Sequence, residues 1–150
     1  MAHRRYNGST RHARSRGAIM VEAALTIIVF LMILFGIIDF GRMIWAYSTV
    51  AHATREAARY AMVHGSTSAA PAGSAQVAGV VRSQLLALDG SKVQVSVEWI
   101  ASNPPPVTGI ANRPGDTVAI RSDYPFSTLL PYMPAGALHL KSSSRMMIHH

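Results

Sequence analysis

The chain has 150 residues, no cysteine and a net charge of +7. This length leaves room for one small domain besides a membrane segment, and the lack of cysteine excludes disulfides, thiolate metal sites and lipid attachment through cysteine. Five arginines and no acid lie in residues 1–17, whereas the remainder carries nine basic and seven acidic side chains. The excess charge therefore flanks an apolar segment, where it sets membrane topology, and this argues against a nucleic-acid-binding protein.

An apolar run of 21 residues follows the basic leader, from Ala18 to Ile38, and Glu22 is its only ionisable residue. As a helix, the run is long enough to cross the roughly 30 Å hydrocarbon core of a bilayer. It exceeds the roughly 7–15 apolar residues of a cleaved secretory signal and ends without an Ala-x-Ala site, so we expect the helix to remain in the protein. The basic leader predicts a cytoplasmic N-terminus, with everything after about residue 40 outside.

The helical pattern continues beyond this run. Apolar and small residues recur at spacings of three and four from Phe40 to Ala61, which indicates an amphipathic helix. No proline interrupts the stretch, and Gly65 opens a segment rich in small and polar residues that ends it. We therefore expect one helix from about Ala18 to His64.

The chain after residue 65 predicts a small head domain. Residues 65–75 predict a flexible link, and apolar residues at helical spacing predict a second, shorter helix from Gln76 to Leu88. Alternating apolar and polar residues predict strands at 93–100 and 117–124, and a third that opens at 138–141 and extends towards Met147. Proline and glycine place loops at Asn103–Gly115 and Pro125–Gly136.

The predicted fold is thus a membrane-anchored α+β protein with a long N-terminal helix, a short helix and a small antiparallel sheet. We divide the chain into four parts: a basic cytoplasmic leader (1–17), a transmembrane helix (18–40), its extracytoplasmic continuation (41–64) and a small α/β head domain (65–150).

No pattern in the sequence predicts catalytic residues, a cofactor or a metal site. The seven histidines share no metal-binding spacing on one element. No glycine-rich phosphate loop follows a predicted strand, and no G-x-S-x-G nucleophile motif occurs. We therefore expect a protein that is not an enzyme.

Two charged groups on the long helix each have two interpretations. Asp39 and Arg42, three residues apart at the outer edge of the span, either dock a neighbouring subunit or form an interfacial ion pair worth less than about 1 kcal/mol; we favour the ion pair. Arg55, Glu56 and Arg59 form either a solvated helix face or a packing surface for a partner.

Four short motifs carry a resemblance to a known family. They are Arg16-Gly17, Val21-Glu22, Gly-Ile-Ile-Asp-Phe-Gly-Arg at 36–42 and Thr-Arg-Glu-Ala-Ala-Arg-Tyr-Ala at 54–61. In this order and spacing, residues 16–64 resemble the TadE-like family, minor pilins or pseudopilins of the tight-adherence (Flp) pilus system with a type IV pilin-like fold. The chain departs from the family at Ala57, where glycine is usual, and lacks the proline often found in the apolar run.

The resemblance implies that a prepilin peptidase removes the leader between Gly17 and Ala18. Glu22, the fifth residue of the mature chain, then neutralises the new Ala18 amine in its own or an adjacent subunit; the alternative is that Glu22 merely reaches back to the cytoplasmic interface.

The resemblance also implies a place in the bacterial inner membrane or the pilus and a role in pilus assembly, adhesion or secretion. The expected partners are other pilins or pseudopilins, the prepilin peptidase and the inner-membrane pilus platform, but no nucleic acid. The competing interpretation is an unprocessed, single-pass membrane protein whose extracytoplasmic head binds a partner.

Overall fold

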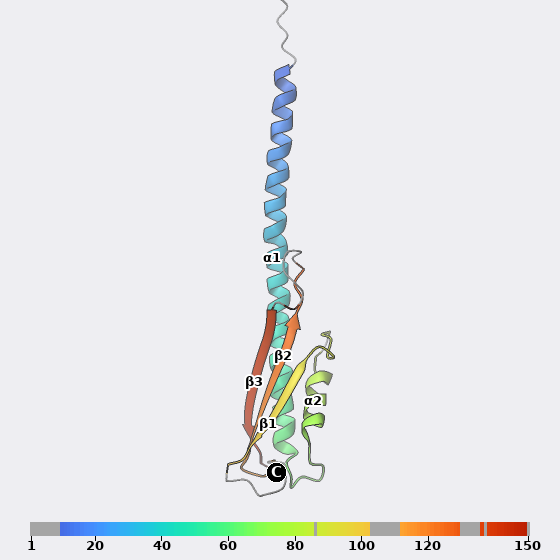
Figure 1. Ribbon diagram of the computed structural model, residues 1–150, viewed down its shortest axis with the longest axis vertical. Coiled ribbons are helices and arrows are strands. Elements are labelled where there is room, and N and C mark those ends of the chain that lie inside the picture. Colours follow the sequence, from blue (N-terminus) through green and yellow to red (C-terminus); the bar gives the residue numbers. More distant parts are fainter. Residues whose placement is uncertain (1–9, 86, 103–111, 130–135, 137, 150) are drawn as a thin grey trace, which may run out of the picture.

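The computed structural model describes residues 10–85, 87–102, 112–129, 136 and 138–149, with side chains from residue 17 onward. Within this part the elements follow in the order α1 (Thr10–Val63), α2 (Ser74–Ser83), β1 (Gln94–Ile100), β2 (Thr117–Phe126) and β3 (Leu138–Met147). The head packs on the C-terminal half of α1, and the N-terminal half projects beyond it (Figure 1). The predicted membrane-anchored α+β, pilin-like fold is confirmed.

α1 begins earlier than predicted. It starts at Thr10 rather than Ala18, ends at Val63 rather than His64, and runs without a break through Arg16-Gly17-Ala18. The leader segment in the helix contains no proline, and a single glycine in a helix interior costs only about 1 kcal/mol. The leader from Thr10 onward and the apolar span are therefore one continuous helix.

The N-terminal half of α1 carries an apolar surface that the chain itself does not cover. From Ala18 to Ile38 every residue except Gly36 is exposed, and the most apolar 18-residue window of the helix has a mean hydropathy of 2.7. Leaving this surface in water would cost about 25 cal/mol per Å². Length and composition fit a single-pass membrane anchor, while the division at residue 40 stays a prediction.

The three strands form one antiparallel sheet in the order β1-β2-β3. Ile120 on β2 lies opposite Val97 on β1 and Ser144 on β3, so these three side chains share the face that packs on the helices. β2 continues past the predicted end at Tyr124 through Pro125, which β2 can accommodate because its pairing with β1 stops at Asp123. The opposite face of the sheet is mostly polar and exposed.

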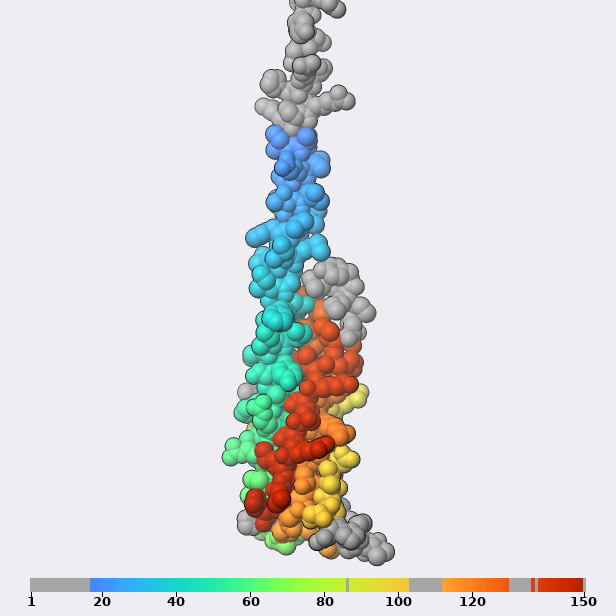
Figure 2. Space-filling view, turned by 90° about the vertical axis from the view of Figure 1, so that its left-hand side faces the viewer, coloured from blue at the N-terminus to red at the C-terminus, as the bar shows by residue number. Residues whose placement is uncertain are grey.

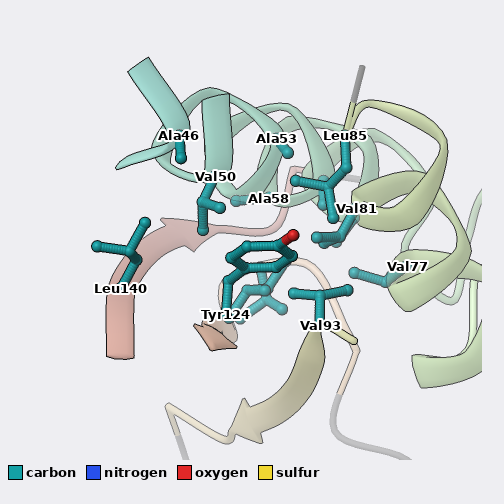
Figure 3. Close-up of a cluster of buried hydrophobic side chains, with 14 of the residues drawn as sticks. Ala46, Val50, Ala53, Ala58, Val77, Val81, Leu85, Val93, Tyr124 and Leu140 are labelled. Atoms are coloured by element: carbon teal, nitrogen blue, oxygen red, sulfur yellow. The ribbon is translucent and has the colours of Figure 1, made fainter. Parts of the chain in front are cut away.

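α1 contacts β2 and β3, whereas α2 contacts α1 and β1; Figure 2 shows the C-terminal half of α1 along one side of the molecule with β2 and β3 beside it. Small side chains dominate the buried face of α1 and allow close approach to the sheet; they are Ala46, Val50, Ala53, Ala57, Ala58 and Ala61. Tyr124 lies at the centre of the core between Val50, Val81 and Val93 (Figure 3).

The second helix and the loops differ from prediction in their bounds. α2 spans Ser74–Ser83 instead of 76–88, and the chain then turns, with Ala87 at a φ of 61°, which a right-handed helix does not allow. β3 covers the whole of Leu138–Met147. Of the two predicted loops, residues 103–111 and 130–135 lie outside the described residues.

Candidate assembly surface on the long helix

Gly17 lies on an open stretch of α1. The residue is exposed, and, among the described atoms outside its chain neighbours and its own helix backbone, none lies within 4 Å of the position that a Cβ would take. Packing inside the chain therefore does not require glycine here. Gly36 and Gly41 on the same helix are equally open.

Glu22 follows on the same exposed helix. Its backbone carbonyl accepts a hydrogen bond from Thr26 Oγ1 at 2.9 Å, but its carboxylate has no hydrogen-bond or ion-pair partner among the described side chains. A charged group inside a spanning helix costs about 2.5–3.5 kcal/mol on insertion scales. Ala18 lies four residues earlier, about 6 Å along the axis and on the same helix face. Glu22 thus lies one helical turn from Ala18.

Asp39 is the best-anchored charged group of the long helix. Its side chain is only 7% exposed, and Arg42 Nη1 donates to Oδ1 at 2.9 Å. The other carboxylate oxygen, Oδ2, accepts from the Leu129 backbone N–H at 3.1 Å. The Arg42 guanidinium also lies over the Phe126 ring, 5.5 Å from its centroid. This cluster, which we call the Asp39 clasp, joins α1 to the segment that follows β2.

The clasp changes how the Asp39–Arg42 pair is understood. The sequence predicted an ion pair at the edge of the span, and the structure forms one. Sequence reasoning missed Phe126 and Leu129, because their approach to Asp39 depends on how the sheet folds back along α1. The only local signal was an aspartate placed at the end of an apolar run.

Arg55, Glu56 and Arg59 are arranged differently. Arg55 and Arg59 are exposed and Glu56 is half-buried. Within the described part of the chain, no ion pair joins Glu56 to Arg59 or to His52, although the spacing allows both. Both arginines thus lie on the surface, and none of the described residues forms an ion pair with them.

The outer face of the sheet holds a shallow hollow of about 570 Å³. Charged groups beside it pair with one another: Arg121 Nη2 lies 3.6 Å from Glu98 Oε2, and His139 Nδ1 lies 2.7 Å from Asp123 Oδ1. Among the described residues, no group of three His, Asp or Glu side chains is arranged to hold a metal ion. The hollow shows no orphaned charge that would select a ligand.

Asp116 organises the end of the head that lies away from the membrane span. Its buried carboxylate accepts from the Ser102 N–H at 2.9 Å and the Arg113 N–H at 3.2 Å. The Ser102 hydrogen bond is the main cause that holds the pKa of Asp116 below its ordinary value, against the opposing effect of burial. The sequence indicated only a turn at this position.

Comparison with known proteins gives one match. Residues 17–59 match the model of the family described as TadE-like protein. No curated protein and no solved structure matches the chain significantly. The match covers the leader junction at Gly17, the apolar span, the Asp39 clasp residues on α1 and the arginines up to Arg59. It confirms, over these residues, the resemblance seen in the sequence.

Proposed function

Because α1 matches the TadE-like family, we propose that this protein is a non-catalytic pseudopilin subunit of a tight-adherence (Flp) pilus or a related secretion machine. The match over residues 17–59 carries the proposal. The matched residues include the exposed apolar span of α1 and the first part of the helix that contacts the head. Assembly would use these surfaces. TadE-like pilus proteins are generally non-catalytic, and the proposed role depends on structure rather than on chemistry.

Processing is the first step of the proposed function. A prepilin peptidase cuts between Gly17 and Ala18, which requires the helix to open locally, because α1 is continuous there. Glycine lowers the cost of that opening by about 0.5–1 kcal/mol relative to alanine and leaves the backbone accessible. The exposed, unobstructed position of Gly17 supports this step.

Assembly is the second step. Cleavage creates an amine at Ala18 whose ordinary pKa of about 7.7–8.0 leaves it mostly protonated at pH 7. The Glu22 carboxylate neutralises this amine within the chain or in an adjacent subunit, which lowers the cost of both charges in the bilayer. Sister pilins or pseudopilins, the prepilin peptidase and the inner-membrane platform are the proposed partners, with the N-terminus cytoplasmic and the head outside.

The intact mass and N-terminal sequence of the full chain, purified from membranes of its own host, test the proposal. We expect a mature chain that starts at Ala18. The variant Gly17→Val should stay uncleaved, whereas Gly41→Val, at an equally open glycine of the same helix, should be cleaved normally.

A wild-type chain that starts at Met1 in a host with active prepilin peptidase would contradict the proposal. It would favour an unprocessed, membrane-anchored protein whose head binds a partner. Equal cleavage of Gly17→Val and the wild type would contradict the assignment of the cut site.

A further inference from the structure

Two arginines and a histidine lie on the side of α1 that faces away from the sheet. His52, Arg55 and Arg59 are all exposed and recur at spacings of three and four residues, so they share one helix face. The buried face of the same helix segment is formed by Ala53, Ala57 and other small residues. We call the surface of His52, Arg55 and Arg59 the cationic face, after the charges of its two arginines. No ion pair reaches it from the part of the chain that the structure describes.

Most acidic side chains of this chain are engaged away from the cationic face. All seven acidic side chains lie in the described residues. Five of them bind groups of their own surroundings, namely Asp39, Asp89, Asp116, Glu98 and Asp123. Glu22 lies in the apolar span, and Glu56 lies at the flank of the cationic face. The chain therefore has no acidic surface that matches these cations.

A second copy of the chain does not fit the cationic face. Copies anchored in one membrane by the same helix point in the same direction. A symmetric contact through this face would set Arg55 and Arg59 against their own equivalents, and like charges in contact are unfavourable.

Lipid headgroups do not fit either. Arg55 follows the end of the apolar run by 17 residues, which is about 25 Å of helix. The polar layer on each side of the hydrocarbon is only about 5–7 Å deep, and the Debye length at physiological salt is about 8 Å. Anionic lipids are therefore too far away to attract this face.

We propose that the cationic face docks an acidic segment of a different protein alongside α1. This partner would be one of the assembly partners of the proposed function, on which the inference rests. Arg55 and Arg59 are about 6 Å apart along the helix axis. Carboxylates one helical turn apart on a partner helix match that spacing. Glu56, on one flank, disfavours an acidic segment that approaches from its side, which selects the direction of docking.

Site-specific photo-crosslinking in host membranes tests this inference. A photo-reactive residue replaces Ser48, which is exposed one turn before His52, in the otherwise unchanged full chain. We expect a protein adduct whose linked peptide contains Asp or Glu. The double variant Arg55→Glu/Arg59→Glu should lower its yield about tenfold, and Arg55→Lys/Arg59→Lys should retain it.

The control variant Arg82→Glu/Arg145→Glu changes the net charge equally at exposed residues of α2 and β3 and should leave the adduct unchanged. Replacing the acidic residues of the linked peptide by arginine should restore the adduct in the Arg55→Glu/Arg59→Glu variant. An adduct insensitive to the charge reversal, an adduct of two copies of this chain, or an adduct to lipid alone would overturn the inference.

Leader cleavage is measured in the same samples and separates the two proposals. A chain that starts at Ala18 but gives a charge-independent adduct overturns the cationic-face inference alone. A chain that starts at Met1 overturns the proposed function, and the charge dependence of the adduct still decides whether an acidic protein docks on this face.

Discussion

A pair of buried hydroxyl groups joins α1 to the middle strand of the sheet. The Thr54 and Ser122 hydroxyl oxygens lie 2.9 Å apart, and Thr54 Oγ1 lies 2.7 Å from the Val50 carbonyl oxygen. Each hydroxyl carries one proton. Both hydroxyl protons and the Val50 carbonyl oxygen are hydrogen-bonded only when Thr54 donates to Val50 and Ser122 donates to Thr54. Ser122 thus depends on Thr54 for its hydrogen bond, whereas the Thr54 proton does not depend on Ser122.

This asymmetry predicts unequal effects of two substitutions. Thr54→Val keeps the shape of the side chain but leaves the Ser122 hydroxyl, 1% exposed, without its acceptor. We expect a loss of about 1–3 kcal/mol in the free energy of unfolding. Ser122→Ala removes the dependent hydroxyl and leaves the Thr54 donor satisfied, so we expect only about 0.5–1 kcal/mol. The double variant should lose less than the sum, by about 1 kcal/mol.

Urea unfolding of the head in nanodiscs measures these free energies. Trp99 is a suitable reporter, because its Nε1–H donates to Ser74 Oγ at 3.0 Å and so joins β1 to α2. Trp45 is replaced by Phe in every variant, including the reference protein, so that the fluorescence comes from Trp99 alone. Equal m-values are required for the comparison, because they show that the same surface unfolds in each variant.

Two results would refute the hydroxyl-pair reasoning. One is a Thr54→Val variant that is no less stable than Ser122→Ala. The other is a double variant whose loss equals the sum of the single losses within about 0.3 kcal/mol, which is the behaviour of independent sites.

Three further predictions concern charged groups. Asp39→Ala should increase hydrogen exchange at the Leu129 amide about tenfold or more, because that N–H loses its buried acceptor; unchanged exchange in mass spectrometry would contradict the clasp. Asp116→Asn should lower stability at pH 7, but its stability should fall less than that of the wild type as the pH drops below 3.8. The lowered pKa of Asp116 gives stabilisation that is complete above its ordinary value of 3.8 and disappears as the pH falls; parallel acid-unfolding curves would contradict this. Glu22→Ala should leave membrane insertion intact but reduce pilus output and co-purification with pilus proteins, whereas Thr26→Ala, on the same helix face, should not; equal output of wild type and Glu22→Ala would contradict the charge pairing.

Local sequence patterns predicted most of the fold. An uninterrupted apolar run and three- and four-residue spacing predict α1 because a helix places such residues on one face, whatever the rest of the chain does. Alternation likewise predicted β1 and β2 and the opening of β3. The errors lie at element ends, such as the start of α1 at Thr10 and the end of α2 at Ser83, where small differences in local free energy decide.

Contacts between distant segments decided the roles of individual side chains. The sequence placed Asp39, Arg42 and Arg55 on one helix, but it did not show that the first two hold the head and that the third has no ion-pair partner among the described residues. That difference arises because the sheet folds back along α1, which brings Leu129 to Asp39, while Arg55 on the opposite helix face is exposed. Spacing along the chain describes one element, whereas the partner of a buried charge depends on how elements pack together.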